Sequence, residues 1–257
     1  MHIHRFLLLL LAIAAPARAD EAEPPPRRDA AQSTRDGLLL PFTLSARVGD
    51  ARVVATALGG YSTADYRGGL FGAVVEGQIV NRVAIRAGYE FTQGNLVTPN
   101  AFSAGVRVAL LRQERHYIDL ALSAAYRSIG LTESNGLVEL GLLVGRRFGN
   151  LGLFANFTFA QGFSLETHHG EVRLAALYNF TDRFALGFDT RGRFDMASVV
   201  GPELEPEVDI DIIAGPMATY SIGPISFIGQ VGGQVLTFEE RKPAGGFAAQ
   251  AGLGASF

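Results

Sequence analysis

The sequence RFALGFDTRGRFD, residues 183–195, decides the fold because apolar and charged side chains alternate along it. Phe184 and Phe188 fall on one side of an extended chain, whereas Asp189 and Arg191 fall on the other. Successive side chains of a strand point to opposite faces, so a strand separates the two sets, whereas a helix would scatter the charges around its circumference. The stretch therefore predicts a strand with one apolar face and one polar face.

The same alternation recurs along most of the chain. It predicts strands at 51–62, 68–79, 83–93, 101–111, 117–127, 136–147, 150–161, 170–180, 183–194, 207–220, 224–236 and 246–257. These segments are about ten residues long, which suits a tilted strand that spans a membrane and is about twice the ordinary strand length. Short turns alternate with longer polar loops, such as the one expected at 162–169, as in an up-and-down barrel. A soluble sandwich is the alternative, but it would place few charges in mid-strand.

The composition excludes several classes of protein. The 257 residues suffice for one barrel domain, and 48% of them are hydrophobic. The chain has no cysteine, so it offers neither a disulfide framework nor a thiolate metal site. A net charge of −3 without a clustered basic face gives no sign of nucleic-acid binding. The sequence assigns no catalytic, cofactor-binding or metal-binding residue.

The first 19 residues predict a secretory signal peptide. A short basic start precedes an apolar run at 6–15 that is too short to span a bilayer, and Ala17-Arg18-Ala19 matches a cleavage site that ends at Ala19. Residues 20–50 are expected to be a disordered or loosely ordered periplasmic lead-in, because their first part is rich in proline and charge. Whether 37–48 lies against the barrel or begins the first strand stays open, and 51–257 is assigned to the barrel.

The last strand carries a more specific pattern. In GFAAQAGLGASF, Phe247, Leu253 and Phe257 share one face, and an aromatic residue ends the sequence. This pattern resembles the C-terminal assembly signal of bacterial outer-membrane β-barrel proteins. The resemblance implies an outer-membrane location, contact with outer-membrane lipid, and recognition by the barrel-assembly machinery and periplasmic chaperones during biogenesis.

The polar faces of the predicted strands would line the inside of the barrel. The candidate pore-lining residues are Arg52, Glu76, Arg86, Glu90, Arg107, Asp119, Arg127, Glu139, Glu171, Arg173, Asp189, Arg191, Arg193, Asp209 and Asp211. These charges are nearly balanced and leave two interpretations open. They could set the selectivity of a narrow channel, or they could form an arginine–carboxylate network that fills the barrel. Arg191 and Arg193 could pair with Asp209 and Asp211 across the ladder.

Two other clusters could carry chemistry. Ser164, Glu166, His168 and His169 fall in the expected outer loop, and outer-membrane phospholipases and lipid A deacylases also use serine and histidine. Nucleophilic catalysis needs a base within hydrogen-bond reach of the hydroxyl, and no surrounding motif matches those enzymes, so a solvated loop is the simpler interpretation. The acidic run at 203–211 lacks the glycine and asparagine residues that shape a calcium loop.

The sequence thus predicts an all-β protein, a single transmembrane antiparallel up-and-down barrel of about twelve strands. The expected function is a small passive, porin-like pore of unknown substrate. A lipid-modifying hydrolase of the outer leaflet and a sealed structural or adhesive barrel that presents its loops are the alternatives.

Overall fold

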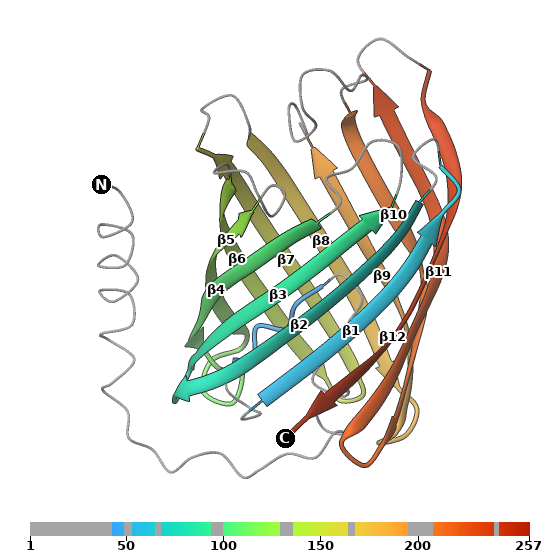
Figure 1. Cartoon of the computed structure of the whole chain (residues 1–257). Helices are drawn as coiled ribbons and strands as arrows, with labels where there is room; N and C mark the ends of the chain where they lie inside the picture. The colour runs from blue at the N-terminus through green and yellow to red at the C-terminus, as the bar shows by residue number, and fades with distance from the viewer. Residues whose placement is uncertain are drawn as a thin grey trace.

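The computed structural model describes residues 43–48, 53–64, 68–93, 100–128, 136–163, 168–194, 208–238 and 242–257. Within these residues, twelve strands form one closed barrel in which every strand runs antiparallel to its neighbours (Figure 1). The strands are β1 (Val53–Ser62), β2 (Gly68–Val80), β3 (Val83–Gln93), β4 (Asn100–Leu111), β5 (Asp119–Ser128), β6 (Gly136–Phe148), β7 (Leu151–Gly162), β8 (His168–Asn179), β9 (Phe184–Phe194), β10 (Val208–Ile222), β11 (Ile225–Phe238) and β12 (Ala244–Ser256). The predicted fold class and strand number are confirmed.

The barrel closes where β1 meets β12. The two strands pair in register from Val54 opposite Ser256 to Ser62 opposite Ala248. Next to the Val54–Ser256 pair, the backbone N–H of Phe257 donates to Val53 O over 2.9 Å, and the N–H of Val53 donates to Phe257 O. A closed sheet leaves no edge strand, so the backbone groups of every strand find partners inside the protein.

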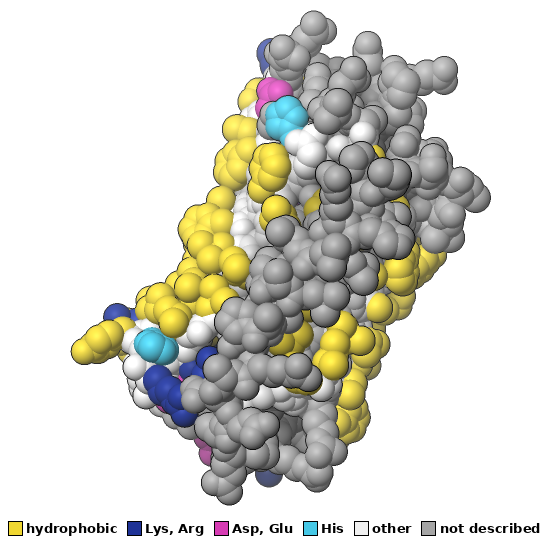
Figure 2. All heavy atoms as spheres, turned by 90° about the vertical axis from the view of Figure 1, so that its left-hand side faces the viewer, with side chains coloured by type: hydrophobic (Ala, Val, Ile, Leu, Met, Phe, Trp, Pro, Cys, Tyr) yellow, Lys and Arg dark blue, Asp and Glu magenta, His cyan; other side chains and the backbone are white. Residues whose placement is uncertain are grey.

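The outer surface is apolar along the strands. Alternate residues such as Phe71, Phe157 and Leu253 point outward, and about half of each side chain is exposed (48%, 48% and 51%). Figure 2 shows hydrophobic side chains over the flanks of the barrel, with charged groups towards its two ends. Exposed apolar area of this extent is unfavourable in water and favourable in the hydrocarbon of a bilayer, so the barrel is built to span a membrane. No described segment forms a helix long and apolar enough to do so.

The two ends of the barrel differ. At the turn end, which also holds Phe257, the strands are joined by tight connections such as the two-residue turns at 81–82, 149–150 and 223–224 (Figure 1). Gly149 and Gly223 have φ near +57° (58° and 56°), and Arg82 has φ 70°. Two-residue hairpins require this left-handed backbone, and glycine adopts it without strain. The opposite end, the loop end, carries the connections that were predicted to be longer.

A short stretch before β1 lies inside the ring of strands. Residues 43–48, here called the strap, appear as a blue trace within the barrel (Figure 1). Thr43, Ser45, Ala46 and Val48 are each at most 2% exposed. Of the two positions left open by the sequence for this stretch, the strap therefore lies against the barrel, on its inner wall. The signal peptide and the rest of the predicted lead-in lie outside the described residues.

Candidate functional site in the barrel lumen

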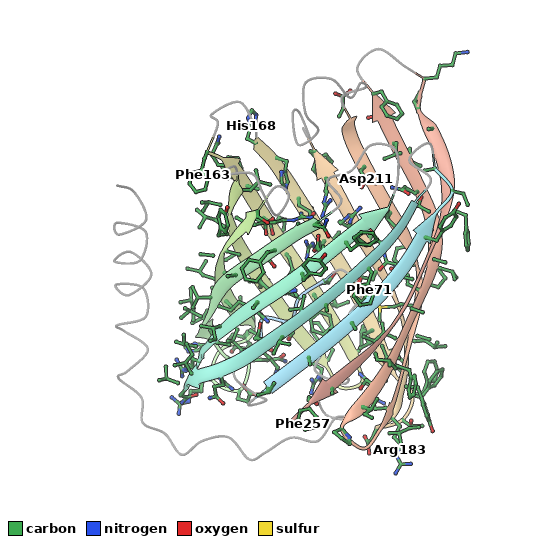
Figure 3. The ribbon with its side chains drawn as sticks, viewed as in Figure 1. Phe71, Phe163, His168, Arg183, Asp211 and Phe257 are labelled. Atoms are coloured by element: carbon green, nitrogen blue, oxygen red, sulfur yellow. The ribbon has the colours of Figure 1, made fainter. Side chains whose placement is uncertain are left out.

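The charged residues predicted to face inward lie on the inner side of the wall. Arg52 lies outside the described residues, and Asp209 lies where the register of β10 shifts against β11. The other candidates alternate with exposed apolar residues, and Asp189 (0% exposed) and Glu171 (3%) are fully enclosed. Side chains from many strands thus converge on one lumen, where Asp211 is labelled in Figure 3.

Arginines and carboxylates of β8 to β10 pair near the loop end. The Arg191 guanidinium donates to Asp211 over 2.6 Å, which confirms one of the cross-ladder pairs anticipated from the sequence. Arg193 instead pairs with Glu171 on β8, its direct partner in the ladder, and Arg173 binds the same carboxylate. Glu171 therefore joins two arginines, and the pairing runs across both sides of β9.

Two uncharged residues extend this network around the wall. Gln234 on β11 donates from Nε2 to Asp211 Oδ1 over 2.8 Å, and it accepts a hydrogen bond from the Ser62 hydroxyl on β1. Sequence reasoning missed both residues because it selected charge alone. Both residues fall on the inward side of their strands, and this position could have identified them as lumen residues.

A second set of ion pairs lies on β2 to β5. Arg107 pairs with Glu76 over 2.7 Å, and Arg127 pairs with Glu90 over 2.5 Å. Arg86 stands opposite Glu76 in the ladder between β2 and β3, but no ion pair joins it to another described residue. The Arg86 guanidinium therefore faces the lumen. The carboxylate opposite it in the ladder, that of Glu76, pairs with Arg107 instead.

One end of the strap is bound to the wall at β7 and β9. The Thr43 hydroxyl donates to Asp189 Oδ1 over 2.6 Å, and the Thr43 N–H donates to Oδ2 of the same carboxylate. Leu44 exchanges two hydrogen bonds with the side-chain amide of Asn156, at 2.6 and 2.9 Å, as it would with the backbone of a neighbouring strand. The enclosed carboxylate and amide of the wall are thereby satisfied by the strap.

The other end of the strap is bound to β4, β5 and the turn between them. Arg107 donates to the carbonyl oxygen of Ser45. Arg47 pairs with Asp119 over 3.0 Å and with Glu114 over 2.8 Å, and its own side chain is only 9% exposed. Asp119 and Arg107, predicted as pore-lining residues, therefore hold the chain's own N-terminal segment.

Three of the four wall residues that pack under the strap are alanines. Ala46 and Val48 of the strap are buried in one apolar cluster with residues of β3 to β6. The wall residues of this cluster are Ala84, Ala109, Ala121 and Leu143. The Arg112 side chain donates to the Val48 carbonyl over 3.1 Å at the edge of this cluster. The small side chains leave the room that the strap occupies.

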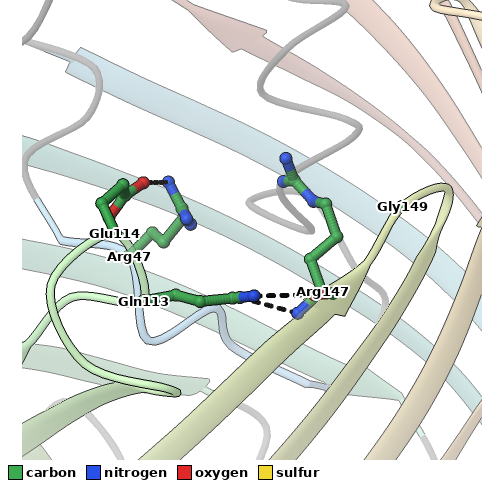
Figure 4. Close-up of a pocket in the computed structure, with 5 residues that line it drawn as sticks. All are labelled: Arg47, Gln113, Glu114, Arg147 and Gly149. Atoms are coloured by element: carbon green, nitrogen blue, oxygen red, sulfur yellow. Dashed lines mark hydrogen bonds and ion pairs between the residues drawn. The ribbon is translucent and has the colours of Figure 1, made fainter.

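A pocket of about 290 Å³ opens beside the strap at the turn end (Figure 4). Its lining is Arg47, Gln113, Glu114, Arg147 and Gly149. The side-chain amide of Gln113 exchanges two hydrogen bonds of 2.7 Å with the backbone of Arg147, which fixes the turn after β4 against β6. The strap thus forms part of the surface that faces the turn-end mouth of the lumen.

The histidine pair differs from its predicted setting. β8 begins at His168, so His168 and His169 lie on a strand, and the expected loop at 162–169 is shorter than predicted. The sequence His168-His169-Gly170 contains no apolar residue, so the alternation did not reveal a strand there. His168 is exposed at the loop end (Figure 3) and His169 is buried, while Ser164 and Glu166 lie outside the described residues.

Of the residues of the predicted assembly signal, Phe247 and Leu253 lie on the outer face of β12, and Phe257 directly follows this strand. Phe247, Leu253 and Phe257 are exposed by 52%, 51% and 64%, and Phe257 stands at the turn end (Figure 3).

Of the residues in the acidic run, Glu203, Glu205 and Glu207 lie outside the described residues, and Asp211 pairs with Arg191.

No protein-family model matches the chain, and no curated protein matches its sequence. Solved structures share its fold. The KdgM porin superposes with a TM-score of 0.53 at 10% identity, over 79% of this chain and 99% of that one. The NanC porin gives 0.56 at 10% identity (79% and 100%), and an outer membrane channel from Pseudomonas putida F1 gives 0.55 at 10% identity (80% and 96%). The chain therefore has the fold of small porins of the bacterial outer membrane, and the C-terminal pattern had implied that membrane without selecting porins.

Proposed function

We propose that the chain is a small passive channel of a bacterial outer membrane. The observation that carries this proposal is the charged inner wall of a closed barrel whose outer face is apolar. Burying a charged group is costly unless it is hydrated or paired, and a barrel that served only as a scaffold could fill its interior with apolar side chains. Arg86, which no ion pair joins to another described residue, stands beside Glu76, whose carboxylate pairs with Arg107; this arrangement favours a lumen that contains water.

The solutes we propose are small and polar, with no dedicated site for one of them. KdgM has also been solved in complex with disordered oligogalacturonate, a polyanion. In this chain the candidate inward arginines face slightly more carboxylates, and several of the two kinds pair directly, as in Arg127–Glu90. Paired charges cancel each other's field over short distances, so we expect weak ionic selectivity rather than a polyanion path.

Conductance in planar lipid bilayers tests the channel. The purified full-length mature protein is expected to produce discrete current steps in 1 M KCl, whereas detergent alone produces none. Heat-modifiable mobility on gels verifies that the added protein is a folded barrel. The channel would be refuted if folded protein gave no current steps and the variant Thr43→Ala/Arg47→Ala, which releases the strap, gave none either.

A sealed barrel is the second candidate, and one observation favours it. The strap lies inside the lumen and is bound to strands a third of the ring apart, through Thr43 to Asp189 on β9 and through Arg47 to Asp119 on β5. A barrel closed by its own strap would present its loops without conducting. The bilayer measurement separates the two functions, because a sealed barrel stays silent.

The proposal includes export and assembly. A signal peptide cleaved after Ala19 would deliver the chain to the periplasm, where chaperones and the barrel-assembly machinery would receive it and insert it into outer-membrane lipid. The intact mass of protein isolated from outer membranes tests the cleavage site, with a mature chain expected to begin at Asp20. A different mass would move the start of the mature chain.

A further inference from the structure

We infer that the strap, residues 43–48, is a displaceable plug that sets the conducting width of the lumen. This inference rests on the proposed channel function. It assigns to the N-terminal segment the role of a gate, with a narrow state when the strap is seated and a wider state when it is displaced.

The first argument is that the strap occupies part of the lumen, along the wall from β9 to β4. Thr43 is bound to β9 through Asp189, and Ser45 is bound to β4 through Arg107. In the closed ring, β5 to β8 separate these two strands on one side, and β10 to β12 with β1 to β3 separate them on the other. Between these anchors Leu44 is bonded to Asn156 on β7, so the strap follows the inner wall from β9 towards β4 and takes up space inside the ring.

The second argument is that the strap is held by side chains of the wall. Its backbone groups bond to the carboxylate of Asp189, the amide of Asn156 and the guanidinium groups of Arg107 and Arg112. Side-chain hydrogen bonds and ion pairs can open while the ladders between strands stay intact. Displacement of the strap therefore does not require the barrel to unfold.

The third argument is that the wall leaves a space in which the strap is buried. Ala84, Ala109 and Ala121 face it in the cluster that buries Ala46 and Val48. Gly145 lies beside it, and a Cβ added there would stand 3.9 Å from the Cβ of Ala46. With the strap displaced, the lumen would be wider beside these small side chains and would conduct more ions.

A reversible disulfide tests the gate directly, because the chain has no cysteine of its own. In the variant Ala46→Cys/Gly145→Cys, the two Cβ atoms would lie 3.9 Å apart, within the usual 3.5–4.5 Å of a disulfide. The added Cβ meets Phe154 and Asp119 at 3.5 and 3.7 Å, which are ordinary contacts. The oxidised protein is expected to show only the small current steps, and reduction in the same bilayer is expected to restore transitions to larger steps.

A second variant releases the strap without a cross-link. Thr43→Ala/Arg47→Ala removes the hydroxyl bonded to Asp189 and the guanidinium paired with Asp119 and Glu114. We expect the ratio of wide to narrow states to rise about tenfold or more, since a hydrogen bond to a charged group contributes at least that factor. The matched control is Arg183→Ala, a turn residue drawn away from the barrel wall (Figure 3), which is expected to leave the ratio unchanged.

The outcomes separate the gate from the channel. The single variants Ala46→Cys and Gly145→Cys control for the substitutions and are expected to ignore oxidant and reductant. Equal step sizes in the oxidised and reduced double variant, with the disulfide verified by mass, would overturn the gate and leave the channel standing. Silence of the wild type, the reduced double variant and the released variant, all as folded barrels, would overturn both.

Discussion

Single residues of the inner wall fall into two groups, those that hold partners and those that face the lumen. Asp189 is fully buried and accepts two hydrogen bonds from Thr43, while Glu171 is shared by Arg173 and Arg193. Such enclosed and paired charges contribute to structure more than to the field along the lumen. Arg86 belongs to the second group, because no ion pair joins it to another described residue.

Removing the charge of Arg86 tests whether it faces permeating ions. Arg86→Gln is expected to lower the anion-to-cation permeability ratio by up to about fivefold, because two unit charges about 4 Å apart in water interact by ~1 kcal/mol. The reversal potential in a tenfold KCl gradient measures this ratio. Arg183→Gln, at the turn end, is the matched control and should leave the potential unchanged. An unaltered potential in Arg86→Gln would place that guanidinium outside the conduction path.

The strands follow the alternation of the sequence closely. β3 and β9 occupy Val83–Gln93 and Phe184–Phe194, where the sequence predicted 83–93 and 183–194. The prediction failed by two residues at the start of β8, where His168-His169-Gly170 provides no apolar side chain to mark the outer face. The apolar face is set by the surrounding lipid, so the alternation gives no signal where the outward residues of a strand are not apolar.

The hairpin between β10 and β11 depends on glycine at one position. Gly223 has φ 56°, a conformation that costs a residue with a Cβ roughly 1–2 kcal/mol. Gly223→Ala is therefore expected to lower the free energy of unfolding by about that amount, measured by denaturant titration in lipid vesicles. Gly229→Ala is the matched control, because that glycine lies on β11 with open space around its would-be Cβ. Equal stability of the two variants would show that the turn tolerates a side chain.

The whole molecule depends on the closure of β1 against β12. Phe257 completes this seam through its backbone, while its side chain is 64% exposed on the outer face. The backbone of Phe257 thus helps to close the barrel, whereas its side chain is free of that task and is the part we propose the assembly machinery recognises.

Replacing the Phe257 side chain isolates the second role. Phe257→Ser keeps the backbone hydrogen bonds with Val53, so we expect a several-fold loss of folded protein in outer membranes together with normal refolding in vitro. Quantitative gels of heat-modifiable protein measure both. Phe180→Ser, at an equally exposed aromatic residue of a turn, is the control and should assemble normally. If Phe257→Ser assembled normally, the Phe257 side chain would not be part of the assembly signal.

The sequence by itself determined which side chains face oil and which face the lumen, and hence the strand number and the closed barrel. A period of two is a local property, written in neighbouring residues and enforced by the bilayer. The tertiary structure decided the contents of the lumen. The strap has no period, and its partners lie as far as 146 residues away, from Thr43 to Asp189. The pairing of Arg193 with Glu171 likewise follows from register across the ladder, which no single strand specifies.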